Sequence, residues 1–353
     1  MASERERTRC RERLERLSES TLDRESIQRE AIADLQRVIG FDRWCWPFAD
    51  PETLLPLSGV AEHDFGPGVP RQLELEYSDD HFAAKHVLAL RANPAASLST
   101  ETGGDLALSD RWDEVMRPAG IGDVAAVACR DALGCWGWIE AYRDESDRRF
   151  EAGDLELLAG VGPSLGSALR RGLMVASESP FGPSPPGVIV LNPELTPVSS
   201  TAGARAWIDV LPGAALFAGW AMLPAQVYPV ATRARSRNSV TGTHALERAV
   251  DGRWVMIEAA VLEGDCEGQI AITLRSAAPA ETFDLFCRAY AFTQRERDVA
   301  AAVVAGLDTR ALTEQLFISR HTVQDHLKSI FQKIGIHSRR QLLASFNALS
   351  DGR

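Results

Sequence analysis

Polar side chains gather on one face of the segment that follows Ser319, and their types suit contact with nucleic acid. Gln324 carries the donor and acceptor pair that can bind the edge of adenine, and Lys328 can donate to guanine or to a phosphate. Asp325 is repelled by phosphate, so on DNA it must accept from a cytosine amino group or pair with a neighbouring cation such as Lys328. These side chains predict an interface for double-stranded DNA.

Four further side chains suit contact with the sugar-phosphate backbone, which positions a protein on DNA without reading its sequence. They are Thr322, His326, Arg339 and Arg340. The predicted DNA-binding residues are therefore Thr322, Gln324, Asp325, His326, Lys328, Arg339 and Arg340.

A helix must position most of these residues, because apolar side chains recur at helical spacing on the opposite face. These apolar residues are Val323, Leu327, Ile330, Phe331 and Ile334. Ser319 caps the start of the helix, and Gly335 ends it.

Three more short helices are predicted around it. A T-x-x-E capping box at residues 293–296 begins the first, which ends at Gly306. Asp308 or Thr309 caps the second, and an S-x-x-Q capping box at residues 338–341 begins the fourth. A three-residue turn between the second and third helices predicts a helix-turn-helix, whose third helix enters the major groove.

Residues 292–344 resemble the LuxR-type helix-turn-helix of bacterial transcription regulators. They match the family's L-T-x-R-E-x-x-V opening, with Phe292 in place of the Leu, and its Gly after the first helix. The I-S-x-x-T-V-x-x-H start of the recognition helix and the G-(V/I)-x-S-R segment before the last helix also match. The family's usual T-V-K reads Thr322-Val323-Gln324 here, and Asp325 follows.

The resemblance implies a sequence-specific, DNA-binding transcription regulator rather than an enzyme. A domain with few base-reading side chains binds DNA more tightly when two copies pair on a palindromic site, and we therefore expect a homodimer. The family implies that the fourth helix lies at the dimer contact. RNA polymerase is a further candidate partner. The alternative is a sensory or protein-interaction adaptor whose helix-turn-helix no longer binds DNA, and Asp325 is the reason to consider it.

The first half of the chain predicts a mixed α+β unit. A charged, solvated lead-in helix is expected in residues 1–21, followed by strands at 44–48 and 72–77, a hairpin at 124–142 and a helix at 154–171. The order of elements in residues 22–175 resembles a GAF domain, as does the F-x-x-x-D-L-E-L-L run that begins at Phe150. Four tryptophans, which could be core or could line a small-molecule site, fall in this unit: Trp44, Trp46, Trp136 and Trp138.

A second α+β unit follows a Pro-rich linker at residues 176–187. Residues 188–278 resemble a small PAS-like sensor domain, with strands at 188–191 and 195–198, a helix at 202–208 and a hairpin at 254–274. Residues 210–249 show no clear periodicity. A linker helix at 279–291 precedes the helix-turn-helix of residues 292–353, so the expected fold is a multidomain chain of GAF-like and PAS-like α+β domains followed by an all-α, four-helix LuxR-type domain.

Net charge is distributed unevenly between these parts. The 353 residues carry a formal charge of −11, which taken alone argues against a nucleic-acid partner. Residues 288–353 hold ten Lys and Arg against six Asp and Glu, leaving 28 basic and 43 acidic residues in the rest. A basic C-terminal segment attached to an acidic remainder of the chain is therefore compatible with DNA binding.

Other chemistry finds little support. His81 and His86 lie five residues apart, whereas helical metal ligands lie three or four apart, so no metal and no cofactor are expected. No catalytic triad, P-loop or dinucleotide motif is visible. The six cysteines form no C-x-x-C pair, and no apolar run approaches the roughly 18 residues of a membrane span, so we expect a reduced, cytoplasmic protein.

Overall fold

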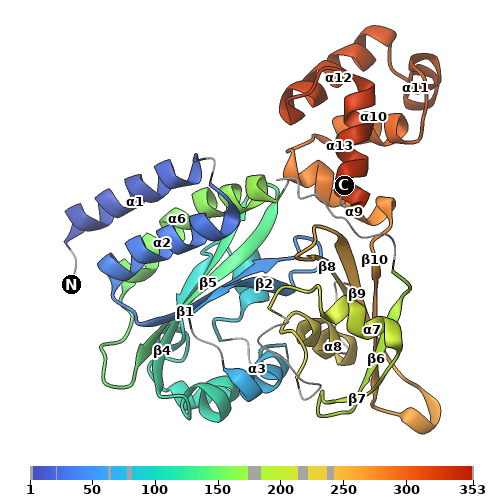
Figure 1. Ribbon diagram of the computed structural model, residues 1–353. Coiled ribbons are helices and arrows are strands. Elements are labelled where there is room, and N and C mark those ends of the chain that lie inside the picture. The colour runs from blue at the N-terminus through green and yellow to red at the C-terminus, as the bar shows by residue number, and fades with distance from the viewer. Residues whose placement is uncertain are drawn as a thin grey trace.

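The computed structural model describes residues 3–20, 22–62, 65–77, 82–173, 184–213, 222–236 and 242–351. Two antiparallel sheets lie side by side, each with helices on its faces, and the C-terminal helices form a separate body beyond them (Figure 1). None of the described helices is long and apolar enough to span a membrane.

The first unit is built on a five-stranded sheet with the order β2-β1-β5-β4-β3. Its strands are β1 (Arg43–Ala49), β2 (Pro56–Ala61), β3 (Ala95–Ser97), β4 (Ile121–Asp131) and β5 (Gly134–Asp144). The predicted hairpin at 124–142 is thereby confirmed as β4 and β5, which are apolar and buried along most of their length.

Three helices lie on the same side of this sheet, two against its strands and the first packed on the other two helices (Figure 1). They are α1 (Glu4–Ser18), α2 (Arg24–Ile39) and α6 (Ala152–Gly172). The lead-in helix is present as α1, but it is not solvated throughout, because Cys10 and Leu14 are fully buried against the neighbouring helices.

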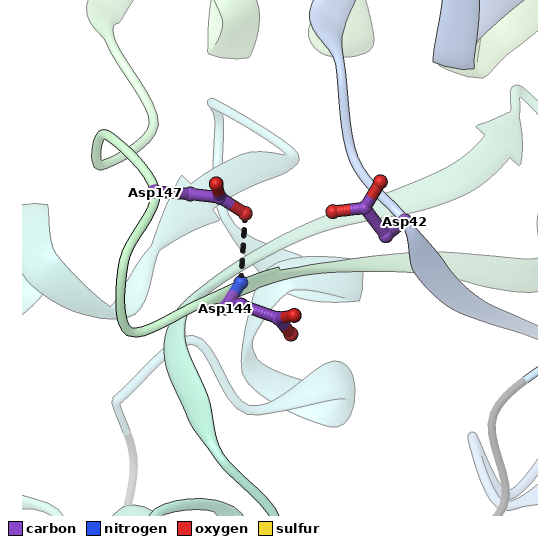
Figure 2. A group of neighbouring side chains, drawn as sticks. All are labelled: Asp42, Asp144 and Asp147. Carbon is purple, nitrogen blue, oxygen red and sulfur yellow. Dashed lines mark hydrogen bonds between the residues drawn. The ribbon is translucent and has the colours of Figure 1, made fainter.

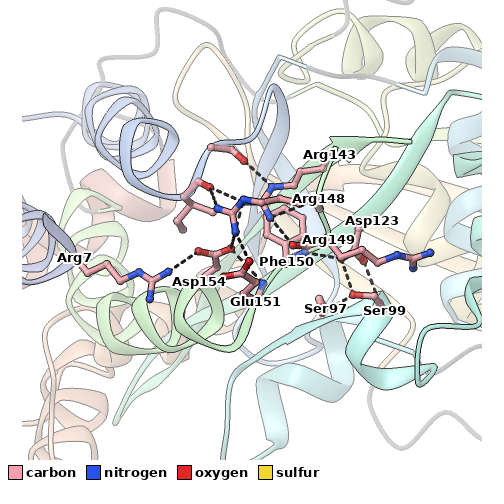
Figure 3. Close-up of polar contacts among 12 residues, drawn as sticks. Arg7, Ser97, Ser99, Asp123, Arg143, Arg148, Arg149, Phe150, Glu151 and Asp154 are labelled. Carbon is pink, nitrogen blue, oxygen red and sulfur yellow. Dashed lines mark hydrogen bonds and ion pairs between the residues drawn. The ribbon is translucent and has the colours of Figure 1, made fainter. Parts of the chain in front are cut away.

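A buried carboxylate ties these layers together at the start of α6. Asp154 accepts hydrogen bonds from Arg7 of α1 (3.1 Å) and from Arg143 of β5 (3.3 Å), as Figure 3 shows. Asp123 of β4 accepts from the backbone N–H of Phe150 at 2.9 Å. The D-L-E-L-L run therefore begins a helix whose first turn is fixed by long-range ion pairs and hydrogen bonds.

The strand expected at residues 72–77 is wrong: this segment lies in helix α3 (Val69–Glu76). Leu73, Leu75 and Tyr77 alternate as in a strand, but Pro70 lies in the first turn of a helix. The polar residue between the last two, Glu76, is buried and forms an ion pair with Lys85. The shorter helices α4 (Lys85–Leu90) and α5 (Leu98–Glu101) follow. All four tryptophans named above are buried.

The second unit has the sheet order β7-β6-β10-β9-β8. Its elements are β6 (Gly187–Leu191), β7 (Pro197–Ser200), α7 (Ala202–Ile208), α8 (Val227–Arg235), β8 (His244–Arg248), β9 (Trp254–Val261) and β10 (Ile270–Ser276). The predicted strand at 188–191, the helix and the hairpin are confirmed with small shifts at their ends, whereas the strand predicted at 195–198 lies two residues later, as β7. Helix α8 and strand β8 lie in the described part of the stretch that showed no periodicity.

Helix α9 (Pro279–Ala289) connects this sheet to the C-terminal body. That body contains α10 (Gln294–Val304), α11 (Thr309–Leu316), α12 (Arg320–Ile334) and α13 (Arg339–Asp351). Phe286 and Cys287 of α9 join its hydrophobic core, so the helix expected at 279–291 is packed into the domain that it leads to.

Two expectations fall partly outside the described residues. Residues 174–183, which include most of the predicted Pro-rich linker, lie outside the described part of the chain. So does His81, one of the two histidines considered above as metal ligands. The remaining member, His86, stacks on the Tyr77 ring with the centroids 5.1 Å apart.

Candidate functional site

The helix-turn-helix is formed by α11, a short turn and α12. Asp308 caps α11 by accepting from the N–H of Ala311 at 2.8 Å, and Ser319 caps α12 by accepting from Thr322 at 3.1 Å. Phe317 makes the turn in the left-handed region, with φ 54°, and its side chain is 93% exposed. Local caps thus set where each helix begins, as the sequence predicts.

Helix α12 has one buried and one exposed face. Val323, Leu327 and Ile330 are buried against α10 and α11, whereas Gln324, Asp325 and Lys328 are exposed. The predicted reading face is therefore uncovered by the rest of the described chain.

A single carboxylate fixes α12 to α10. Glu296 completes the capping box with Thr293 and also accepts from Ser329 and Lys333 of α12, both at 2.6 Å. Burial alone would raise its pKa, but the bonds from Lys333, Ser329 and the Thr293 amide outweigh burial and lower the pKa of Glu296 to about 2. No local sequence pattern indicates this second role, because the partners lie more than 30 residues away.

Two of the predicted DNA-binding residues have protein partners that sequence spacing did not indicate. Asp325 lies 3.7 Å from His321, one turn earlier in α12, and in the described part of the chain it makes no ion pair with Lys328. Arg339 donates to the hydroxyl of Thr309 at 2.9 Å and to the carbonyl of Leu307 at 3.4 Å, which holds α13 against the α10–α11 loop.

The other predicted residues remain accessible to different degrees. Gln324, Lys328 and Arg340 are exposed, whereas Thr322 and His326 are half-buried. The exposed start of α12 adds two side chains to those predicted from the sequence, Arg320 and His321. Their position could have indicated them, since the first residues of a recognition helix point toward the bases.

A separate buried charged cluster lies in the first α+β unit. Lys85 donates to Glu76 at 2.8 Å and pairs with Glu140 at 2.9 Å, and Arg111 is buried 3.6 Å from Glu76. Burial opposes ionisation of Glu76, but the two cations lower its pKa to about 2, so the cluster stays charged. Of this cluster, Lys85 and Glu140 border a cavity of about 220 Å³, together with Cys45 and with the start of α8 from the second unit.

Three aspartates form a small acidic group where β1 begins and β5 ends (Figure 2). Carboxylate oxygens of Asp42, Asp144 and Asp147 lie within 4.8 Å of one another. Arg43 already donates to Asp144, and Asp147 accepts the backbone N–H of Asp144 at 3.1 Å. An exposed group with these protein donors gives no reason to assign a metal.

Comparison with known proteins identifies the C-terminal body. Residues 290–346 match the family model described as GerE, bacterial regulatory proteins of the luxR family. This part of the chain is therefore a LuxR-type helix-turn-helix domain.

Curated relatives match over short segments. The spore germination protein GerE of Bacillus subtilis is 39% identical over 49 residues, which is 14% of this chain and 66% of that protein. A nitrate/nitrite response regulator homolog of Haemophilus influenzae is 38% identical over 47 residues, 13% of this chain and 23% of its own length. An HTH-type transcriptional regulator of Mycobacterium tuberculosis is 43% identical over 51 residues, 14% of this chain and only 6% of that protein.

Among solved structures, Escherichia coli SdiA superposes with a TM-score of 0.35 and 11% identity, covering 96% of each chain. The matched segments cover less than two thirds of the length of each curated relative named above. The first 289 residues of this chain lie outside the segment that matches the family model.

Proposed function

We propose that this protein is a transcription regulator that binds double-stranded DNA through α12. The observation that carries the proposal is the uncovered polar face of α12, with Gln324, Asp325 and Lys328, on a domain of the LuxR type. An exposed recognition helix held by buried contacts on its other side can enter the major groove without rearrangement of its own fold.

Each side chain has a proposed role on DNA. Gln324 binds an adenine edge, and Lys328 binds guanine or a phosphate. Thr322, His326, Arg339 and Arg340 contact the backbone. Asp325 accepts from a cytosine amino group, and His321 beside it offsets its charge when protonated.

Two features support control by the front units. Both sheets have the same order when their strands are numbered within each unit, which supports the GAF-like and PAS-like interpretation of two related sensor folds. The 220 Å³ cavity beside Lys85 is our candidate for a small-molecule ligand of the first unit.

We also propose that a homodimer binds a palindromic site, with α13 at the contact. Light scattering of the full chain with and without DNA tests this. A monomer that occupies single half-sites at full affinity would contradict it.

The salt dependence of DNA binding tests the proposed function. Affinity for genomic fragments should fall steeply as salt rises, because phosphate contacts release counterions. The competing proposal, an adaptor that no longer binds DNA, is favoured by the carboxylate of Asp325 on the exposed face. Absence of binding at low salt, with the full chain folded, would favour the adaptor.

A further inference from the structure

A cavity of about 490 Å³ lies where the two α+β units meet helix α9. Phe48 and Trp136 border it from the first unit, Trp254 from the second, and Leu285 from α9. Its volume is typical of small-molecule sites, and its aromatic wall suits a flat apolar group. This cavity is distinct from the one beside Lys85.

The guanidinium of Arg24 is unusual among the charged groups that border this cavity. It lies over the Phe48 ring, with its central carbon 3.4 Å from the ring centroid. Among the described residues Arg24 donates no hydrogen bond and has no carboxylate within 4.0 Å. Burial consequently lowers the pKa of Arg24 to about 9.

A second donor in the wall also lacks an acceptor. Trp254 is 3% exposed, and its indole N–H is buried without a hydrogen-bond partner among the described residues. Arg248 adds positive charge, since its guanidinium lies 5.9 Å from the Trp254 ring. Buried donors without acceptors are costly, so a bound acceptor would stabilise this arrangement.

The acidic side chains of the wall do not supply that acceptor. Glu52 is 61% exposed and lies 3.9 Å from His244. Each of the others already accepts a hydrogen bond from an arginine or a backbone amide: Asp50, Glu247, Glu258, Glu281 and Asp284. Among the described wall residues, the buried side-chain N and O atoms that lack any hydrogen-bond partner are both donors, Arg24 Nε and Trp254 Nε1.

We propose that this cavity binds a small aromatic carboxylate, whose carboxylate group is held by Arg24 and whose ring packs beside Trp254 and Trp136. An arginine can donate two parallel hydrogen bonds to a carboxylate, and the indole N–H offers another donor to a ligand acceptor. Aromatic rings in the wall favour an offset or edge-on aromatic partner.

Such a ligand would touch the helix that leads to the DNA-binding domain. Leu285 borders the cavity, and its neighbours Phe286 and Cys287 lie in the core of the C-terminal body. An effect of the ligand on DNA affinity rests on the proposed function, whereas its binding does not. The two are therefore measured separately.

Isothermal titration of the full chain with benzoate, phenylacetate and indole-3-acetate tests the site. The matched amides benzamide, phenylacetamide and indole-3-acetamide keep the ring and remove the charge. We expect at least one acid to bind and its amide to bind about tenfold or more weakly. Equal binding of acid and amide, or no binding of any acid at millimolar concentration, would overturn the proposal.

Variants locate the binding. Arg24→Gln should lose about tenfold or more in affinity for the acid, and Trp254→Phe, which keeps a ring but removes the N–H, should lose less. Arg29→Gln, on the exposed side of the same helix, is the matched control and should bind as wild type. Circular dichroism confirms folding of each variant. Wild-type affinity in Arg24→Gln would overturn the assignment, and if the acid binds without changing DNA affinity, only the regulatory coupling is lost.

Discussion

Glu296 shows how one side chain can do more than its local sequence motif indicates. Its carboxylate caps α10 within a T-x-x-E box and also accepts from Lys333, whose ammonium group donates in addition to the carbonyl of Ala291 at 2.7 Å. The exposed face of α12 is therefore held at a fixed orientation to α10 through an ion pair whose carboxylate is buried.

Replacing Glu296 with Gln should destabilise the C-terminal domain by about 3 kcal/mol near neutral pH, as follows from a pKa lowered to about 2 from 4.5. Because the folded-state pKa is the lower one, this stabilisation is complete above pH 4.5 and is lost as the pH falls toward 2. Denaturant unfolding of wild type and variant as a function of pH measures it. Glu314→Gln, whose side chain is 66% exposed, is the control, and equal losses in the two variants would contradict the account.

Lys328→Ala should weaken binding to DNA and reduce the slope of log affinity against log salt by about 1 if the ammonium contacts a phosphate. The side chain is exposed and makes no hydrogen bond or ion pair with a described residue, so the fold should not change. Arg29→Ala in α2 removes the same charge far from α12. Equal affinities for Lys328→Ala and wild type would show that this face does not contact DNA.

At the scale of elements, the close packing of α6 on β4 depends on a glycine that carries no side chain. A Cβ atom at Gly166 would lie 2.8 Å from the backbone of Cys129 and Arg130, which cannot move aside as a side chain can. Gly160 in the same helix faces Arg11 instead, whose flexible guanidinium would lie 3.0 Å away.

Gly166→Ala should therefore cost about 1–3 kcal/mol of stability through overpacking, although Ala favours helix more than Gly does. Gly160→Ala should be neutral or stabilising, because Arg11 can shift. Thermal and urea unfolding compare the two variants. A stabilised Gly166→Ala would mean that α6 and β4 are less tightly packed than described.

Elements with local signals were predictable from the sequence. Caps and apolar periodicity within each segment define α10 to α13, and the hairpin of β4 and β5 follows from two apolar runs. Helix α3 was not predictable, because its alternating Leu73, Leu75 and Tyr77 imitate a strand. Buried Glu76 is stabilised by an ion pair with Lys85, and a contact between two single residues leaves no periodic pattern in the sequence.

The candidate DNA interface could be predicted as a face but not in its side-chain contacts. Helical spacing places Gln324, Asp325 and Lys328 outward, and they are exposed. Spacing could not decide which basic side chain lies beside Asp325, since His321 and Lys328 are both within one turn of it. The bonds from Arg339 to Leu307 and Thr309 join segments about 30 residues apart and depend on tertiary packing.

At the scale of the whole molecule, the first unit directly contacts α9, the helix that leads to the C-terminal body. Arg170 at the end of α6 pairs with Asp131 at 2.7 Å and donates to the carbonyl of Ala289, the last residue of α9, at 2.6 Å. Arg288 of α9 donates to the carbonyl of Leu133 at 3.4 Å in return. A change in the first unit can therefore reach α9 without passing through the second.

Arg170→Ala should loosen this contact and speed hydrogen exchange at the backbone amides that end α9, while the sheet of the first unit stays protected. Mass spectrometry of exchanged peptides measures both regions in one experiment. Arg29→Ala again serves as the control. Unchanged exchange at α9 in Arg170→Ala would show that the hydrogen bond to Ala289 does not restrain the helix.

Selection of bound sequences from a random double-stranded DNA pool, with the full chain, tests the central claim most directly. The account predicts enrichment of a two-fold symmetric sequence whose half-sites contain positions sensitive to replacement of Gln324 and Asp325 by Ala. The same selection with these variants should relax sequence preference at those positions and leave others unchanged. A folded wild-type chain that enriches no sequence over the starting pool would contradict the assignment of α12 as a DNA-reading helix.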